Sequence, residues 1–554
     1  MQKRDGRYYV YDNPIKKSHS RAAEKWQRMF IKKFNYDPQE TYSLTLQENP
    51  YLGPIFDLKN IVRADAPGNQ PGAPDNTASG ASGKATVERP GAAGAAGLEG
   101  VAGANGPAGA PPIDPETGVI ISTIRMGFGH YRIAMAGASA ARAMGFTPYW
   151  LDLLTIPGIT SDVINWCNSW YSRWSRISQK SAFFNKYVWE PVTTGEPTLP
   201  VLSSLLNSWI VGWPWRFLKT NVKDYKMSEL FGNLHQALPQ DMPILTAHMW
   251  NCMGAVAGGM TNVVDMMFDN WPMAFQLTEG AKHGVQSPSG YYGFRTMRGF
   301  DESGKVMKPL PSEALHYTGH HVDHELVENI EGDCAARLRR MHSGEPRRFM
   351  ITMGGAGAQR ELFKAVIEHC LPLIREDKLS LFVNLGDHTD NWEWLQRELG
   401  GRTEQLTTHF DWEDTREFAD SIRENPIHGL HVFLHDNIFH AVYATNYLMR
   451  VTDVMITKPS ELAFYPIPKI FNERVGGHEM WGAVRGAEIG DGTIETRTIG
   501  HTLQAIDLIS HEDDLLEMYC DQIIKNKKIG TYDGAYKCVE LATGKKFIRS
   551  ETKS

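Results

Sequence analysis

Several features that would identify the class of a protein are missing from this sequence of 554 residues. It has no apolar run of the ~20 residues that a membrane-spanning helix needs, so we expect no transmembrane segment. Its first residues, MQKRDGRYYVYDNP, lack the apolar core of a secretory signal, so we expect a chain that stays in the cytoplasm. The six cysteines include no CxxC pair, which predicts reduced thiols rather than a disulfide framework or a zinc site.

The charge balance gives no sign of a nucleic-acid partner. The formal net charge is −7, whereas general nucleic-acid-binding proteins are usually basic. Hydrophobic residues make up 42% and charged residues 22%, which is ordinary for a globular protein and excludes a fibrous or wholly disordered chain. The length fits three or four domains, or two large core domains with additions.

One segment differs in composition from the rest. Residues 65–112 are almost all Gly, Ala, Pro, Ser, Asn and Asp, and glycine recurs at every third position from residue 91 to residue 109. That spacing is the spacing of a collagen helix, but a flexible linker explains it better because proline is sparse and the stretch is short. The linker separates an N-terminal arm, residues 1–64, from the main body.

The arm contains a predicted amphipathic helix over residues 21–34. Ala22, Trp26, Phe30 and Phe34 fall on one helical stripe, and lysines and arginines lie mostly elsewhere. Docking of the helix on the body of the protein is the favoured interpretation, and contact with an anionic membrane is the alternative.

The body contains two copies of a strand, glycine turn, helix and strand. The first runs from the apolar strand 118–124 through glycines 127 and 129 to the strand 147–153. The second runs from the strand 348–353 through glycines 354–357 to the strand 379–385. We therefore predict an α/β protein with two Rossmann-like domains, whose parallel sheets face across a cleft. The expected boundaries are 113–325 and 326–510, with a C-terminal helix and basic tail over 511–554.

Neither glycine turn has the pattern of a common nucleotide fold. The turn at 354–359 is not GxGxxG, and no Gly-Lys-Ser/Thr of a phosphate-binding loop occurs. Backbone N–H groups at a helix N-terminus still favour phosphate. Tight packing of the strand against the helix is the structural alternative.

The order of four motifs is more informative than any one of them. Met126–His130, Met353–Gln359, Thr457–Leu462 and Gly476–Glu479 each follow a predicted strand or turn. In this order they resemble the motifs of GT-B glycosyltransferases, in the group of monogalactosyldiacylglycerol synthases, processive diacylglycerol glucosyltransferases and MurG. Phe128 and His478 stand where that group has glycine and glutamine.

The resemblance implies an inverting hexosyltransferase of the GT-B fold. It would move a sugar from a nucleotide sugar, a UDP-sugar, to a hydroxyl of a lipid or lipid-linked acceptor, with no cofactor and no essential metal. His130 would be the catalytic base, with Asp269 as the alternative base or its orienting partner, and Gly127 and Gly129 would form the acceptor loop. The donor would be bound by Gly355, Ala356, Gly357, Ala358, Gln359, Lys458, Ser460, Glu461, His478 and Glu479. A structural alternative remains open for three of these residues. In it, His130 only caps a helix, Asp269 only forms a turn and Lys458 is a solvated loop residue.

An aromatic-rich stretch interrupts the first Rossmann-like domain. Trp166, Trp170 and Trp174 share one helical face, and Arg173, Arg176 and Lys180 lie among them. Such a surface suits the headgroup region of a membrane, and an aromatic core is the alternative. We expect a peripheral protein on the inner, cytoplasmic face of an anionic membrane, with a lipid acceptor and no nucleic acid.

Three other possibilities stay open at this stage. One is a GT-B epimerase or hydrolase of nucleotide sugars, and another is an inactive GT-B scaffold that binds a partner. The last is a zinc site among four clustered histidines, which the expected position of these residues in the interdomain linker makes the least favoured: His316, His320, His321 and His324.

Overall fold

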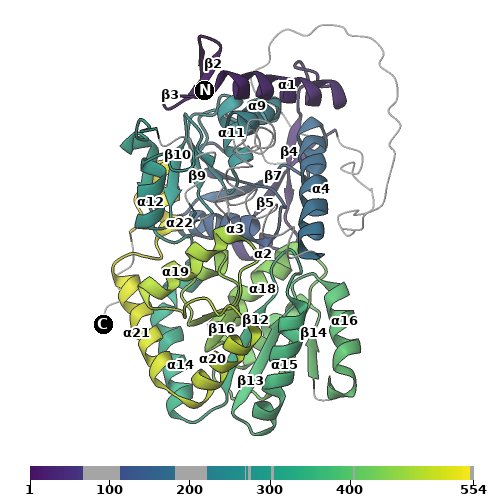
Figure 1. Ribbon diagram of the computed structural model, residues 1–554, viewed down its shortest axis with the longest axis vertical. Helices are drawn as coiled ribbons and strands as arrows, with labels where there is room; N and C mark the ends of the chain where they lie inside the picture. The colour runs from purple at the N-terminus through teal and green to yellow at the C-terminus, as the bar shows by residue number, and fades with distance from the viewer. Residues whose placement is uncertain are drawn as a thin grey trace.

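The computed structural model describes residues 1–65, 113–180, 221–268, 270–271, 276–300, 305–403 and 406–548, and it describes side chains for all of these except 171–180. Two lobes lie one above the other in Figure 1. The expected linker beyond Asp65, most of the aromatic-rich stretch and Asp269 lie outside the described residues.

An eight-stranded sheet forms the N-terminal domain, in the order β11-β10-β9-β8-β6-β7-β5-β4. All neighbours are parallel except β4, which pairs antiparallel with β5 at the edge. The predicted strands at 118–124 and 147–153 are present as β6 and β7. The strands are β4 (Leu44–Glu48), β5 (Lys59–Arg63), β6 (Gly118–Thr123), β7 (Thr147–Asp152), β8 (Ile244–Thr246), β9 (Val263–Met266), β10 (Lys282–Val285) and β11 (Leu315–Tyr317).

The N-terminal arm is part of this domain, which differs from the expected separate segment. Its residues 44–63 form β4 and β5 at one edge of the sheet, where β5 pairs with β7. The predicted amphipathic helix is α1 (Lys17–Lys33), which buries Ala23 and Phe30 and packs against α9 (Asn221–Ser228). The arm also contains a small hairpin, β1 (Gln2–Arg4), β2 (Arg7–Val10) and β3 (Asn13–Pro14), and a short helix, α2 (Gly53–Phe56).

Helices cover the N-terminal sheet. Helix α3 follows the first glycine turn, and it is built from small and apolar residues that let it pack closely on the sheet. The helices are α3 (Phe128–Ala143), α4 (Ile159–Lys180), α9, α10 (Gly232–Gln236), α11 (Met249–Ala257) and α12 (Pro288–Arg295), with 3₁₀ turns at η2 (Glu229–Phe231) and η4 (Ser312–Ala314).

The C-terminal domain has a six-stranded, fully parallel sheet in the order β14-β15-β13-β12-β16-β17. The central strands are buried along their whole length, as continuous apolar runs predict. Both domains are Rossmann-like, which confirms the predicted α/β, GT-B fold class. The strands are β12 (Arg347–Thr352), β13 (Leu379–Asn384), β14 (Leu406–His409), β15 (Gly429–Phe433), β16 (Val454–Thr457) and β17 (Lys469–Phe471).

The helices of this domain alternate with its strands. Most span two to four turns, and α15 begins without a side-chain cap at Gln359. They are α13 (His324–Glu328), α14 (Ile330–His342), α15 (Arg360–Arg375), α16 (Thr389–Leu399), α17 (Trp412–Ser421), α18 (Ile438–Val451), α19 (Met480–Ile489) and α20 (Ile499–His511), with 3₁₀ turns at η5 (Gly400–Thr403), η6 (Glu461–Phe464) and η7 (Gly477–Glu479).

The chain end ties the two domains together. Helix α21 (Asp514–Lys528) packs on α14, whereas α22 (Gly534–Thr543) returns to the N-terminal domain and packs on α3 and the sheet. The largest hydrophobic core is therefore continuous between the domains. Among the described helices none is both long and apolar enough to cross a membrane.

Candidate active site

The predicted motifs meet where the two domains face each other. The loops after β6, β8 and β9 come from one sheet, and the loops after β12, β13 and β16 come from the other. All six leave the carboxyl ends of parallel strands, which is where ligands bind in open α/β sheets. We call this region the interdomain site and define it by the residues described below.

The glycine turn after β12 is held by side chains from the neighbouring loop. Nε2 of His388 donates to the carbonyl of Gly354 at 2.9 Å, and the amide of Asn391 donates to the carbonyl of Gly357 at 3.0 Å. Gly357 has φ +60°, a conformation that favours glycine. The N–H of Gly357 is also used within the turn, where it donates to the carbonyl of Gly354 at 2.9 Å. N–H groups for a ligand would therefore come from the neighbouring residues of the turn and from the uncapped N-terminus of α15.

Lys458 and Glu479 form an ion pair beside this turn. Glu479 is buried and also accepts hydrogen bonds from the N–H groups of Val475 at 2.8 Å and Gly476 at 3.1 Å. Burial opposes its charge, but the Lys458 ammonium, His478 and these N–H groups lower the pKa of Glu479 to about 2. The stem of Lys458 crosses Gly354 so closely that a Cβ there would lie 2.7 Å from Lys458 Cε. The Lys458 ammonium, paired with Glu479, therefore lies next to the glycine turn.

On the opposite side, the first glycine turn starts helix α3. Gly127 has φ +106° at the N-cap position, and His130 lies in the first turn of the helix. The ring of His130 packs edge-on against His248 at 4.8 Å and Phe268 at 4.5 Å between centroids. Burial lowers the pKa of His130, and the Glu461 carboxylate opposes that shift. The imidazole is therefore neutral near pH 7, the form that can accept a proton.

His130 has an incomplete set of hydrogen bonds. Its Nδ1 atom is buried and has no partner among the described residues. A buried polar atom without a partner is uncommon and costs free energy, so it calls for an explanation. A substrate hydroxyl at this nitrogen would supply the missing bond.

The two glycine turns touch each other. A Cβ on Gly355 would lie 2.8 Å from Gly127 Cα and would overlap the backbone nitrogen of Phe128. The Phe128 ring also fits against Gly386, where a Cβ would lie 2.6 Å from the ring. Arg125 completes the contact with an ion pair to Asp387 at 2.8 Å. The structure thus shows the two domains closed on one another at the predicted site.

The other predicted residues lie close by or outside the described part of the chain. Ser460 precedes η6 and makes no capping bond with its side chain, and the His478 imidazole folds back over Gly476. Ala356 is exposed at the tip of the glycine turn, and Gln359 bonds to Asn472 at 2.9 Å. Asp269, the alternative base, is outside the described residues, so its prediction stays untested.

The aromatic residues of α4 were interpreted either as a membrane-facing surface or as part of a core, and two of them differ in this respect. Trp166 packs on Trp26 at 6.0 Å and on Phe30 at 5.4 Å, so it joins α4 to α1. Trp170 is 44% exposed, and the side chain of Trp174 is not described.

Sequence patterns missed several residues of the site. Arg125, Asp387 and His388 were not predicted to lie there. Their only signal was position, because each lies in the loop that follows the carboxyl end of a buried strand, β6 or β13. The four histidines considered for zinc each have a separate protein partner: the carbonyl of Glu313 for His316, the carbonyl of Phe464 for His320, Thr318 for His321 and Tyr536 for His324.

A cavity of about 280 Å³ lies elsewhere in the N-terminal domain. Its lining includes Tyr11, Lys282 and Leu541, at the amino ends of β9 and β10. It is therefore separate from the interdomain site.

Comparison with known proteins gives two family matches and several distant structural likenesses. A family model described as a domain of unknown function (DUF6937) matches residues 9–296, and another with the same description (DUF6938) matches residues 310–543. No curated protein sequence matches the chain.

The solved structures that are similar share little sequence with this chain. S. aureus MnaA in a co-structure with UDP is 12% identical, with a TM-score of 0.37 over 77% of this chain and 94% of that chain. UDP-GlcNAc 2-epimerase from Neisseria meningitidis, bound to UDP-GlcNAc, is 9% identical, with a TM-score of 0.36 over 58% and 82%. The α,α-trehalose 6-phosphate synthase from Burkholderia multivorans is 9% identical, with a TM-score of 0.37 over 77% and 98%. Likenesses of this size leave the activity to be inferred from the residues of this chain.

Proposed function

The chain belongs to the family described as DUF6937, a domain of unknown function, and from its interdomain site we propose that it is a glycosyltransferase using a nucleotide-sugar donor. The observation that carries the proposal is the position of His130. Its neutral imidazole has a buried Nδ1 with no partner among the described residues, and it lies in the first turn of α3, over which the other domain places the Glu461 carboxylate.

Each half of the site suits one half of a glycosyl transfer. The negative charge of the leaving diphosphate would be taken by Lys458, by the α15 N-terminus and by the N–H groups of Gly355, Ala356 and Ala358. His130 would accept the proton of the acceptor hydroxyl while its oxygen forms a bond to the anomeric carbon. The bond from that carbon to the diphosphate breaks, and the nucleoside diphosphate leaves with the electron pair. Attack from the face opposite the leaving group would invert the configuration.

The contact between Gly355 and Gly127 occupies the space through which substrates would enter. The donor diphosphate and the acceptor would both have to lie between these turns, where backbone atoms now touch. We expect the domains to separate for binding, which would also break the ion pair between Arg125 and Asp387.

A hexose donor, a UDP nucleotide and a lipid acceptor at the inner face of a membrane are the finer parts of the proposal. Exposed Trp170 on α4 and Lys33, which lies 4.8 Å from the Trp166 ring centre, support the membrane contact. Aromatic rings beside basic groups suit anionic headgroups. No cofactor and no metal is needed for the transfer itself.

The epimerase or hydrolase remains the second candidate. His130 and Glu461 could also exchange protons with a sugar held alone in the site, and such a reaction needs no acceptor.

The test is a panel of nucleotide sugars, read first by thermal stabilisation and then by product analysis with and without added diacylglycerol lipid. Binding of a donor raises the apparent melting temperature by mass action. Glycosylated lipid formed from the stabilising donor would support the proposal. Conversion of the donor without lipid would favour the epimerase or hydrolase, and no stabilisation by any nucleotide sugar would leave an inactive scaffold as the better account.

A further inference from the structure

A row of polar side chains crosses the N-terminal sheet below the interdomain site. Thr246 of β8, Asp265 of β9 and His283 of β10 are paired in register on neighbouring parallel strands. Residues paired in this way point to the same face of a sheet. All three are buried, and Asp265 is only 3% exposed. The row therefore places a carboxyl group and an imidazole side by side in a core.

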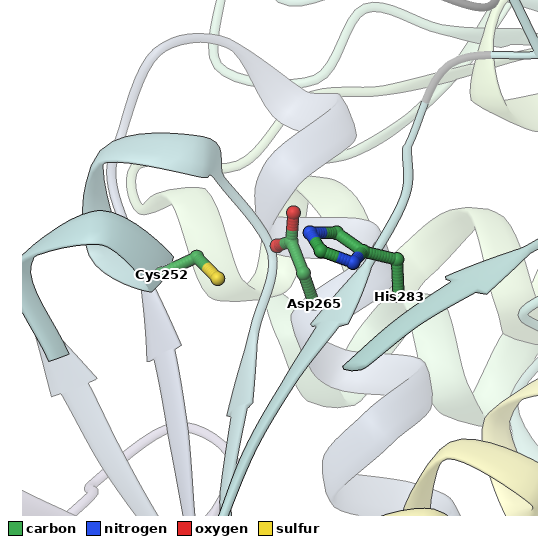
Figure 2. A group of neighbouring side chains, drawn as sticks. All are labelled: Cys252, Asp265 and His283. Atoms are coloured by element: carbon green, nitrogen blue, oxygen red, sulfur yellow. The ribbon is translucent and has the colours of Figure 1, made fainter. Parts of the chain in front are cut away.

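A cysteine from the covering helix faces the same row. Cys252 belongs to α11 and is fully buried. Its Sγ, a carboxylate oxygen of Asp265 and a ring nitrogen of His283 all lie within 4.8 Å of one another. Figure 2 shows the thiol and the imidazole both pointing toward the Asp265 carboxylate. Three different donor groups thus converge from one helix and two strands.

The hydrogen bonds of His283 fix which nitrogen carries the proton. Nδ1 lies 2.9 Å from the carbonyl oxygen of Ala314, which can only accept, so Nδ1 donates. Nε2 then holds the lone pair, and it accepts from the N–H of Thr278 at 3.0 Å. Burial keeps the ring neutral by lowering its pKa to about 4. A ring held by a backbone carbonyl on one nitrogen, with the lone pair on the other, is the arrangement found in metal-binding histidines.

Among the described residues, Asp265 and Cys252 lack a positive partner. Asp265 accepts from Thr246 at 2.7 Å, and it forms no ion pair within the described part of the chain. Burial raises the pKa of Asp265 to about 7 and raises that of Cys252 well above its usual value. The Cys252 thiol also bonds to the buried hydroxyl of Thr278. A divalent cation would offset the charge of an ionised thiol and carboxylate together.

We propose that Cys252, Asp265 and His283 bind one divalent transition-metal ion of the zinc type, as a structural site that joins α11 to β9 and β10. Thiolate, imidazole and carboxylate are ligands of Zn²⁺ rather than of Mg²⁺ or Ca²⁺, which prefer oxygen alone. The Thr278 hydroxyl or a water would fill the fourth position of a tetrahedral ion. Binding releases the protons of Cys252 and Asp265 and displaces the Thr278 N–H from Nε2. The site lies in the core of the domain and does not depend on the proposed activity.

The test uses the full chain, unfolded in a chelator and refolded with excess Co²⁺ as the probe. A thiolate bound to Co²⁺ gives a charge-transfer band in the near ultraviolet, and elemental analysis counts the metal in each chain. We expect about one ion per chain, as three converging donors predict. Cys252→Ser should lose the charge-transfer band, whereas the control Cys370→Ser, a buried cysteine of the other domain, should keep it.

A second measurement needs no variant, in case Cys252→Ser does not fold. X-ray absorption of the zinc-loaded wild type should show one sulfur at about 2.3 Å and nitrogen or oxygen at about 2.0 Å. Absence of bound metal after refolding, or a zinc spectrum without sulfur, would overturn the proposal. The row would then be a neutral hydrogen-bonded core with a protonated Asp265.

Discussion

The carboxylate of Glu461 lies directly over Gly129, so a Cβ at residue 129 would overlap it. Glu461 comes from the C-terminal domain and Gly129 from the first turn of α3 in the N-terminal domain. A carboxylate at a helix N-terminus is favoured by the exposed N–H groups and the helix dipole. The same carboxylate counteracts the burial that lowers the pKa of His130. Glu461 thus links the expected donor domain to the expected base.

Gly129→Ala should move the Glu461 carboxylate away from the first turn of α3. The added methyl group would force the Glu461 carboxylate, the end of a flexible side chain, away from the N-terminus of α3, and losing that interaction costs about 0.3–1 kcal/mol. Chemical denaturation should show the loss of stability. Glu461→Ala should cost as much, and the double variant Gly129→Ala/Glu461→Ala should cost no more than either, because both changes remove the same contact. Equal stability of Gly129→Ala and wild type would show that the two groups do not touch in solution.

His130→Ala should impair turnover and leave donor binding intact. Loss of a positioned general base typically lowers the rate by about 10²–10⁴. Nucleotide affinity, measured by calorimetry, should change little because His130 lies in the opposite domain from the glycine turn at 354–357. His316→Ala, whose ring bonds to the carbonyl of Glu313 in the same domain, is the matched control. Near-normal turnover in His130→Ala would reduce His130 to a structural role and direct attention to Asp269.

Gly355→Ala should disturb the contact between the glycine turns. A Cβ there meets backbone atoms of Gly127 and Phe128, which cannot move as a flexible side chain can. We expect a loss of about 1–3 kcal/mol in unfolding free energy, or an opening of the domains visible in small-angle scattering. Gly332→Ala in α14 is the control, because its Cβ meets nothing within 4 Å and should stabilise the helix by about 0.5–1 kcal/mol. If both variants behave alike, the turns are apart in solution.

The ion pair of Lys458 and Glu479 predicts a specific acid sensitivity. The folded pKa of Glu479 is lowered to about 2 from an ordinary value of 4.5, so its contribution is complete above pH 4.5 and is lost as the pH falls toward 2. A shift of this size corresponds to about 3 kcal/mol. Urea unfolding at several pH values should show Glu479→Gln less stable than wild type at pH 7. The difference should shrink between pH 4.5 and 2, and a constant difference would contradict the assignment.

Trp170→Ser tests the membrane surface. If the exposed ring enters a bilayer interface, the variant should bind anionic liposomes more weakly at unchanged melting temperature. Binding should also fall with salt, since charged headgroups attract the basic residues of α4. Tyr292→Ser, which changes a more exposed aromatic residue on α12 at 72% exposure, is the control. Equal liposome binding by both variants and the wild type would remove α4 from the membrane contact.

The sequence by itself determined the local pattern of this protein. The apolar run at 118–124, the glycines at 127 and 129 and the following helix predicted a buried parallel strand and a turn, and β6 and α3 are found there. The same holds for the second half, from β12 to β13. These features depend on spacing within a short stretch of chain, because side-chain periodicity and glycine turns are local properties.

Only the tertiary structure decided which distant residues meet. The strands of the arm join the sheet beside β7, Glu461 lies over Gly129, and Asp387 pairs with Arg125. The row of Thr246, Asp265 and His283 likewise exists only because three strands pair in one register. Each of these contacts joins segments far apart in the sequence. Strand order, register and domain closure are set by the packing of whole elements against each other, and no spacing within a single segment carries that information.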